Sequence, residues 1–479
     1  GVSEEQPGRG SNDELAVAGR APPIAGTGNS VFWMNDSFTP FREKMEGAEV
    51  NPAAIRAFER AFAGLTSGES GWMPEATLRP VLDLPRLEEF ESEDDGSDDS
   101  GLLARSVMLK LNGGLGTGMG LEKAKSLLPV RGDETFLDLI VRQVLAARQT
   151  SDLRFLLLNS FSTSADTRAH LRHHPELGDP AALEMLQNKV PKILEDTRKP
   201  AVWPQDPTLE WCPPGHGDIY AALLGSGMLQ RLIGEGILYL FVSNADNLGA
   251  TLDPVLLRWF AASGKPFLME VTARTAADRK GGHLAIRDSD GRLVLRESAQ
   301  CPETDLSAFQ DINRHRYFNT NNIWLRLDHL AESLERHGGL LPLPVIRNLK
   351  TIDPRDKKSP KVIQLETAMG AAIECFDGAG AVVVPRTRFA PVKTTADLLA
   401  LRSDAYLITR DGRAVLAPER LGVPPEILLD PAHFKLVDQL DAALAGGVPS
   451  LLHCRRLEVR GPVRFSASDR FVGDVVLDG

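Results

Sequence analysis

The sequence has little cysteine, no long apolar run and fewer basic than acidic residues, and each shortage excludes a class of protein. Four cysteines in 479 residues are too few for a disulfide scaffold, and none has the spacing of a zinc site. We therefore expect free thiols in a reducing, cytoplasmic compartment. The best apolar run, Gly236 to Val242, has the length of a strand, so we expect no membrane-spanning helix and no membrane partner.

The charge balance narrows the range of ligands. Lys and Arg number 54 and Asp and Glu 65, which gives a net charge of −11. A protein that binds duplex nucleic acid needs a large basic surface, so we expect no nucleic-acid partner. A single nucleotide needs only a local positive pocket and is not excluded. The hydrophobic share of 42% and the charged share of 25% are typical of a globular protein rather than a disordered or fibrous one.

The composition changes along the chain and predicts two N-terminal parts. Residues 1–38 are predicted to be a flexible tail, because they are rich in Gly, Pro, Ser and charge, and they lack the apolar core of a signal peptide. Residues 39–100 are predicted to be helical, since apolar residues recur at helical spacing between Ala54 and Phe62. This part ends in the acidic stretch ESEDDGSDDS, whose charges favour a solvated loop.

Residues 101–402 alternate apolar strand candidates with helical patterns, which predicts an α/β domain with a mostly parallel sheet covered on both faces. In such a sheet, ligands bind beyond the carboxyl ends of the strands. Residues 403–479 are predicted to form a small β appendage with strands at Leu457–Phe465 and Phe471–Leu477. The main strand candidates of the α/β domain are Ser106–Leu111, Arg154–Leu158, Ile237–Ser243, Phe267–Thr272 and Phe318–Leu325.

The most informative segment is LKLNGGLGTGMGLEKAKS, residues 109–126. A strand candidate leads directly into five glycines between Gly113 and Gly120, and Lys123 and Lys125 follow. Glycines let backbone N–H groups approach a phosphate closely and adopt positive φ. The spacing fits neither the Walker A pattern nor the dinucleotide fingerprint. We interpret the segment as a loop for an anionic ligand.

Two further residues follow rigid or apolar segments. Asp246 lies just past a strand candidate, in SNADNL, where a carboxylate suits Mg²⁺ together with substrate phosphates; the alternative is a capping or turn aspartate. His216 is held in the turn PPGHGD, and Gly215 beside it leaves its backbone open to a base or a sugar. A structural histidine is the alternative there.

Amides and cations mark two later segments. Asn319 and Asn321, in FNTNN, share one face of a strand candidate, and amides suit sugar hydroxyls. A buried amide network is the alternative. The segment PRTRFAPVK gathers Arg386, Arg388 and Lys393 into a local positive spot for a polyphosphate, with a solvated basic loop as the alternative.

These segments together resemble the UTP–glucose-1-phosphate uridylyltransferases of the eukaryotic type, from about residue 100 to the end of the chain. The resemblance implies a Rossmann-like nucleotidyltransferase domain, preceded by a helical segment and followed by a small C-terminal left-handed β-helix. It also favours a monomer, because the β part is short. The motifs that carry the resemblance are LKLNGGLGTGMG with KAKS, MLQNKVPKI, PPGHGDIY, SNADNLGATLD, GGHLA, LRESAQCP, FNTNNIWL, QLETAMGAAI and RFAPVKTTADLLALRSDAY.

The resemblance implies a role for individual residues. The lysines on the phosphates, and hence the catalytic residues, are Lys125 and Lys393. Asp246 is the implied Mg²⁺ ligand. The sugar phosphate is held by His216, Glu297, Asn319 and Asn321. The nucleotide is bound by Leu111, Asn112, Gly113, Gly114, Gln187, Gly215, Asn244 and Asp246.

The resemblance thus implies an enzyme that makes UDP-glucose and pyrophosphate from UTP and glucose 1-phosphate, with Mg²⁺ as cofactor. The sugar phosphate attacks the α-phosphorus in line, and we expect no covalent intermediate because no Ser, Cys or His is placed as an activated nucleophile. A broad-specificity UDP-sugar pyrophosphorylase stays open, since the choice of epimer rests on a few hydrogen bonds. So does a non-catalytic nucleotide-sugar binding homologue, although both lysines and Asp246 are present.

Overall fold

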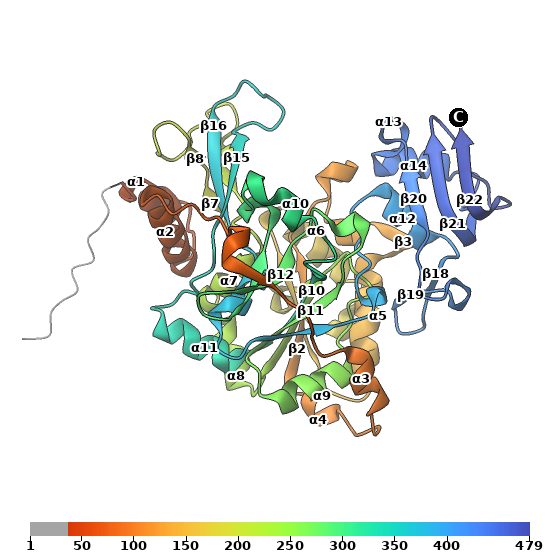
Figure 1. Cartoon of the computed structure of the whole chain (residues 1–479), viewed down its shortest axis with the longest axis horizontal. Coiled ribbons are helices and arrows are strands. Elements are labelled where there is room, and N and C mark those ends of the chain that lie inside the picture. Colours follow the sequence, from red (N-terminus) through yellow and green to blue (C-terminus); the bar gives the residue numbers. More distant parts are fainter. Residues whose placement is uncertain (1–36) are drawn as a thin grey trace, which may run out of the picture.

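The computed structural model describes residues 37–479, so the predicted tail 1–38 lies outside the described residues except for its last two. Helices α1 (Thr39–Gly47) and α2 (Pro52–Thr66) lie within the segment predicted to be helical, at one side of the molecule (Figure 1). The side chain of Asn51 caps α2 by accepting a hydrogen bond from the N–H of Ala53. The two helices are joined by packed aromatic rings of Phe38, Phe41, Phe58 and Phe62.

The acidic stretch 91–100 begins in helix α3 (Leu87–Ser92) and ends where helix α4 (Ser100–Leu103) starts. Most of it is exposed, as its charge predicts. Asp94 and Asp99 nevertheless lie 2.5 and 3.2 Å from guanidinium nitrogens of Arg258, on helix α9 (Pro254–Ser263). The loop is therefore anchored on the central domain by two ion pairs.

A ten-stranded sheet forms the centre of the molecule. The strand order is β1-β12-β14-β10-β2-β5-β6; β11 pairs with β14 and β17, and β13 pairs with β12. Strands β10, β2, β5 and β6 are parallel neighbours, as are β11 and β17, whereas β14 is antiparallel to β10, β11 and β12. These strands are β1 (Leu78–Pro80), β2 (Ser106–Asn112), β5 (Arg154–Asn159), β6 (Glu184–Leu186), β10 (Tyr239–Asn244), β11 (Phe267–Ala273), β12 (His283–Arg287), β13 (Leu293–Arg296), β14 (Tyr317–Arg326) and β17 (Gly380–Val383).

The prediction of a mostly parallel sheet is therefore wrong for the part around β14, and the sheet is mixed. Apolar runs report that a strand is buried but not which way it runs. The prediction of an α/β domain is confirmed, since helices pack on both faces of the sheet (Figure 1).

The two faces of the sheet hold separate apolar cores. Alternation along β2 and β10 sends Met108 and Phe241 to one core and Leu109 and Val242 to the other. The first core includes residues of α5 (Phe136–Ala147) and α9, and the second includes residues of α7 (Ile219–Gly225), α8 (Met228–Gly234) and α11 (Leu327–Arg336). Helix α6 (Phe161–Leu171) contacts β5 and β6.

The C-terminal part ends in a three-stranded parallel sheet at one end of the molecule (Figure 1), formed by β20 (Glu426–Leu429), β21 (Ser450–Arg460) and β22 (Arg470–Asp478). Strand β21 starts earlier than predicted and stops before Gly461 and Pro462. Its buried apolar side chains join the same core as α5. Three parallel strands do not establish a β-helix, so that class and the bounds of the four predicted domains stay predictions.

Shorter elements complete the fold. In the described part of the chain, every helix is too short or too polar to cross a membrane. The remaining helices are α10 (Leu306–Phe309), α12 (Thr395–Arg402), α13 (Pro431–Phe434) and α14 (Val437–Ala443). The remaining strands are β3 (Pro129–Arg131), β4 (Glu134–Thr135), β7 (Val190–Pro191), β8 (Ile193–Leu194), β9 (Trp211–Cys212), β15 (Ile346–Thr351), β16 (Lys361–Glu366), β18 (Tyr406–Ile408) and β19 (Ala414–Leu416).

Candidate active site at the carboxyl ends of β2 and β10

Strands β2 and β10 end side by side at the same edge of the central sheet. They are parallel, with Leu111 opposite Asn244, and the N–H of Ala245 donates to the carbonyl oxygen of Leu111 at 3.1 Å. The glycine loop that follows Asn112 and the segment that contains Asp246 therefore leave the sheet together. This is the edge at which ligands bind in open α/β sheets.

The glycine loop is shaped by close contacts with its neighbours. A Cβ at position 113 would clash with Oε1 of Gln187, so glycine is what lets this side chain reach the loop. The carbonyl oxygen of Gly113 accepts a hydrogen bond from the hydroxyl of Ser160 at 2.9 Å, and that of Gly114 accepts from the N–H of Lys125 at 3.1 Å. The structure thus brings four predicted site residues together.

Lys125 and Asp246 form an ion pair that bridges the two segments. The Nζ of Lys125 lies 2.6 Å from Oδ2 of Asp246, and each side chain is only 17% exposed. Among residues 37–479, the other carboxylate oxygen, Oδ1, is buried without a hydrogen-bond partner. A buried, unpartnered carboxylate oxygen suits a bound cation, because leaving it unpaired is otherwise costly.

The turn that carries His216 fixes the protonation of its ring. Gly215 has a φ of 82° and packs so closely on Thr367 that a Cβ would clash with its backbone. The N–H of Met369 donates to Nδ1 of His216 at 2.7 Å, and burial lowers the pKa of His216 to about 4. At neutral pH the ring is therefore uncharged with its proton on Nε2, which makes that nitrogen a donor.

Asp218 is a residue of this turn that sequence reasoning missed. Its carboxylate accepts hydrogen bonds from the backbone N–H of Asn188 at 2.7 Å and from the amide of Asn188 at 2.9 Å. Burial raises the pKa of Asp218 to about 6, although these hydrogen bonds oppose the rise. Since Asn188 follows Gln187 directly, the contact ties the His216 turn to the Gln187 segment.

Asn319 and Asn321 share one face of β14, as predicted. The N–H of Asn321 donates to Oδ1 of Asn319 at 2.9 Å, and Nδ2 of Asn319 donates to Oδ1 of Asn321 at 3.4 Å. Asn321 has a φ of 63°, beside an irregularity in the pairing of β14 with β11. Asparagine tolerates this left-handed conformation better than most residues do, so β14 can form a bulge here without a glycine.

Glu297 and Lys393, two further predicted site residues, lie near each other. Glu297 packs against Gly282, where a Cβ would clash with its carboxylate. Burial raises the pKa of Glu297, and the positive charge of Lys393 opposes the rise, so the lysine lies within electrostatic reach of the carboxylate. Just before Lys393, the N–H of Val392 donates to the carbonyl oxygen of Asp246 at 3.3 Å.

The comparisons with known proteins identify the family. The family model described as UTP–glucose-1-phosphate uridylyltransferase matches residues 58–470. The chain belongs to this family. Among curated members, the UTP–glucose-1-phosphate uridylyltransferase of Saccharomyces cerevisiae is 37% identical over 443 residues, which are 90% of this chain and 87% of the yeast protein. The enzyme of Solanum tuberosum is 37% identical over 388 residues, 80% of this chain and 79% of its own.

Solved structures of UDP-glucose pyrophosphorylases have the same fold. The Leishmania major enzyme, solved in open and closed structures, has a TM-score of 0.87 and 48% identity over 93% of this chain and 95% of its own. A variant of the same enzyme in complex with UDP-glucose has a TM-score of 0.86 and 49% identity, covering 92% of this chain and 95% of its own. The Trypanosoma brucei UDP-glucose phosphorylase has a TM-score of 0.85 and 49% identity, covering 93% and 95%.

Within this uridylyltransferase chain, the positive spot at residues 386–393 is smaller than its sequence predicts. Arg388 is buried, and two of its guanidinium nitrogens lie 2.8 and 2.7 Å from the carboxylate of Glu270. Arg386 pairs with Asp278 at 2.8 Å. The sequence hides these pairs because the partners lie 118 and 108 residues earlier. Lys393 remains exposed and is the cation of this segment that is open to a ligand.

Asn247, a second residue that sequence reasoning missed, holds the Lys393 segment in place. Its Oδ1 accepts a hydrogen bond from the N–H of Ala390, and its Nδ2 donates to the carbonyl oxygen of Arg388, both at 3.0 Å. Asn247 follows Asp246 directly, so the segment is tied to the part of the chain that carries this carboxylate. Its place in the motif SNADNL was the available signal.

Proposed function

We propose that this chain transfers a uridylyl group from UTP to glucose 1-phosphate, which makes UDP-glucose and pyrophosphate. Membership in the uridylyltransferase family supports the activity. The observation that carries it is the pairing of Lys125 with Asp246 at the shared end of β2 and β10. The segment of Lys393 runs directly beside this pair.

On the nucleotide side, the glycine loop supplies backbone groups to uridine and its phosphates. Gln187 and Gly215 bind the uracil, and Asn244 lies where β10 meets the loop. The contact of Gln187 with Gly113 supports this assignment, because it holds the amide at the loop. The remaining backbone is that of Leu111, Asn112 and Gly114.

The cofactor that we propose is Mg²⁺, held by Asp246. One oxygen of this carboxylate is paired with Lys125, while Oδ1 is buried and has no partner within residues 37–479, which fits a cation ligand. Mg²⁺ prefers oxygen ligands and takes substrate phosphates beside one or two carboxylates. When bound, it supplies neutralisation of the negative charge on the triphosphate.

The two lysines lower the repulsion between the two anionic substrates. A phosphate oxygen of glucose 1-phosphate forms a bond to the α-phosphorus of UTP, and the bond from that phosphorus to the bridging oxygen breaks as pyrophosphate leaves. The attacking oxygen is already anionic at pH 7, so no general base is required. Lys125, fixed by Asp246, and the exposed Lys393 then act by positioning and charge neutralisation.

On the sugar side, His216, Glu297, Asn319 and Asn321 hold glucose 1-phosphate. The proton on Nε2 of neutral His216 donates to an oxygen of this substrate, while the amides of Asn319 and Asn321 bind sugar hydroxyls. Epimers differ by the direction of one hydroxyl, so a broader UDP-sugar pyrophosphorylase is the second candidate. The hydrogen-bonded asparagine pair favours one sugar, because its amides are held in a fixed orientation.

A pyrophosphate-release assay with UTP, Mg²⁺ and a panel of sugar 1-phosphates tests the proposal. We expect turnover restricted to glucose 1-phosphate, and a loss of at least about 10²–10³ in rate in Asp246→Asn, as for other preorganised electrostatic groups. Comparable turnover across several sugars identifies the broad enzyme. No turnover by protein that still binds UTP refutes catalysis.

We further propose a monomer in the cytoplasm, whose C-terminal strands form a short left-handed β-helix. The free cysteines of the described chain support a reducing compartment. The parallel order of β20, β21 and β22 supports the β-helix. Light scattering after gel filtration is expected to give the mass of one chain, 52.2 kDa. Twice that mass contradicts the monomer.

A further inference from the structure

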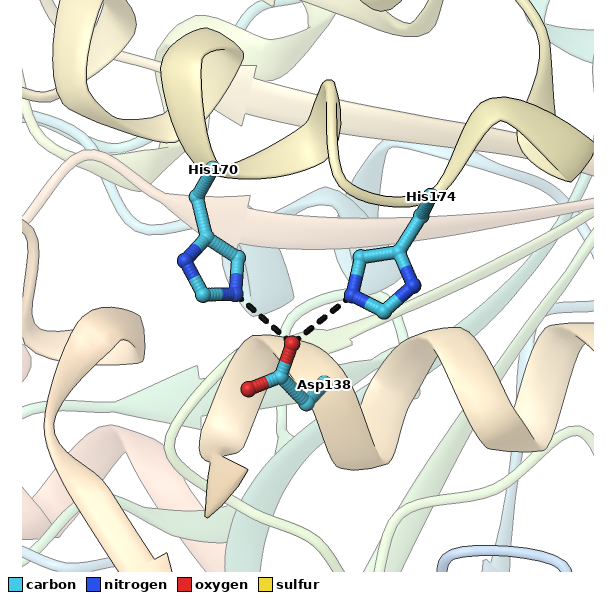
Figure 2. Close-up of side chains that lie close together, drawn as sticks. All are labelled: Asp138, His170 and His174. Atoms are coloured by element: carbon cyan, nitrogen blue, oxygen red, sulfur yellow. Dashed lines mark hydrogen bonds and ion pairs between the residues drawn. The ribbon is translucent and has the colours of Figure 1, made fainter. Parts of the chain in front are cut away.

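Two histidines and an aspartate meet between α5 and α6, outside the residues assigned to catalysis. Asp138 lies in the first turn of α5, His170 in the last turn of α6, and His174 follows one helical turn later. Figure 2 shows both imidazole rings pointing at the same carboxylate oxygen. Nε2 of His170 and Nε2 of His174 each lie 2.7 Å from Oδ1 of Asp138.

The helix cap does not account for this arrangement. Asp138 uses its other oxygen, Oδ2, to accept hydrogen bonds from the N–H and the hydroxyl of Thr135, at 2.9 and 2.8 Å. The cap is complete without either histidine, yet both rings converge on Oδ1. The three candidate ligand atoms lie within 4.8 Å of one another, and the three side chains are 18–25% exposed, so an ion from solvent can enter.

We propose that Asp138, His170 and His174 bind one Zn²⁺ ion, through Oδ1 and the two Nε2 atoms, with water in the fourth position. Two imidazole nitrogens and one carboxylate are a donor set that Zn²⁺ accepts, whereas Mg²⁺ prefers oxygen alone. Ligands of a tetrahedral Zn²⁺ are about 3.4 Å apart, given bonds of roughly 2.0–2.1 Å. Each 2.7 Å separation therefore needs to lengthen by about 0.7 Å to admit the ion, and rotation of the side chains provides this change.

Metal binding requires the proton of each ring to move from Nε2 to Nδ1. Each Nε2 now carries the hydrogen that bonds to Asp138, and a metal ion needs the lone pair of that nitrogen. Each ring stays neutral if its proton moves to Nδ1. For His174, Nδ1 lies 3.6 Å from Oε1 of Glu176, just beyond hydrogen-bond distance, so a small rotation of this exposed glutamate lets it accept the proton's hydrogen bond and orient the ring, as outer partners of zinc ligands do.

The ion would join two elements that flank the glycine loop. Helix α6 supports that loop from two positions: Ser160 at its N-cap donates to the carbonyl oxygen of Gly113, and Thr167, three residues before His170, accepts from the amide of Asn112 at 3.0 Å. A metal held between His170 and Asp138 fixes the far end of the same helix to α5. The expected consequence is a more stable protein rather than a new reaction, since the hydrogen bonds and ion pairs of these three side chains go to residues other than those assigned to catalysis.

The direct test is zinc binding by the full chain after treatment with a chelator. Equilibrium dialysis against Zn²⁺ with excess Mg²⁺ is expected to give one tightly bound Zn²⁺ per chain and a higher melting temperature. In His170→Gln/His174→Gln the affinity falls on the order of 100-fold or more, because two ligands are lost. Glu176→Gln weakens binding by roughly 10-fold, as loss of an outer partner does. The matched control is His173→Gln, an exposed neighbour that keeps wild-type affinity.

If the double variant folds poorly, a second measurement on the wild-type chain still tests the proposal. Co²⁺ in the wild-type chain is expected to show a four-coordinate spectrum without a thiolate charge-transfer band. A thiolate band, which assigns the ion to a cysteine, overturns the proposal. So do equal zinc affinities of the wild type and the folded double variant, and a wild-type chain that takes up no zinc.

Discussion

The two parts of the candidate site that we propose hold the nucleotide and the sugar phosphate, named here the nucleotide side and the sugar side, are built by different means. On the nucleotide side, glycines allow close approach, as where Gly113 admits Gln187, and one ion pair fixes Lys125 on Asp246. On the sugar side, Gly282 likewise admits Glu297, but the amides also hold each other, as where the side chain of Asn319 bonds to the backbone and the side chain of Asn321. Backbone contacts leave a local glycine pattern in the sequence, whereas side-chain contacts depend on the tertiary fold. The comparison predicts that substitutions on the two sides change the kinetic constants of different substrates.

The largest effect is expected at Lys393, which we propose serves both sides. Lys393→Ala removes an exposed cation from between two anionic substrates, so we expect turnover to fall on the order of 10²–10³ with an unchanged melting temperature. Steady-state kinetics and thermal unfolding check this. Lys123→Ala, another exposed lysine of the loop region, is the control and keeps near wild-type turnover. A loss of less than a few-fold in Lys393→Ala removes this lysine from the mechanism.

A second prediction tests the backbone character of the nucleotide side. Gly113→Ala places a Cβ against Oε1 of Gln187, so we expect KM for UTP to rise roughly 10-fold as the amide is displaced. In a Gln187→Ala background the same substitution is expected to have little further effect, because the clash is gone. Gly118→Ala, where a Cβ meets open space, is the control. Additive effects of the first two changes contradict the assigned contact.

A third prediction tests the side-chain character of the sugar side. Asn321→Gly keeps the left-handed backbone at φ 63° and removes only the amide, so we expect a rise of about 10-fold in KM for glucose 1-phosphate. KM for UTP stays within about twofold. Product formation with other sugar 1-phosphates is expected to improve relative to glucose 1-phosphate. An equal rise in both KM values means that Asn321 supports the whole site rather than the sugar.

The smallest effect is expected from the protonation of His216. Its pKa in the folded chain is about 4, below the ordinary value of 6.5, so the unfolded chain binds the proton more readily between these values. Stability therefore falls as the pH is lowered through this window. We expect the melting temperature of the wild type to drop more than that of His216→Gln between pH 7 and pH 4. Parallel curves for the two proteins contradict a neutral, buried ring.

The sequence predicted the features that are local. The strands β2 and β10, the loop after Asn112 and the position of Asp246 follow from short apolar runs and the residues next to them. Features that join distant segments were missed or wrong. The pairing of Arg388 with Glu270 spans 118 residues, and the antiparallel direction of β14 has no signature in its alternation. The roles of the site residues remain predictions that the variants above test.

The buried pair of Glu270 and Arg388 also constrains how this protein can evolve. Glu270 is fully buried, and Arg388 is its cationic partner. Loss of either one alone would strand a charge in the core, at a cost of about 3–5 kcal/mol. Replacing both by apolar residues avoids the stranded charge, but it leaves the indole N–H of Trp324, which donates to Glu270, without this acceptor. Across homologues, the two positions should therefore change together or not at all, which makes them a pair to follow in the family's history.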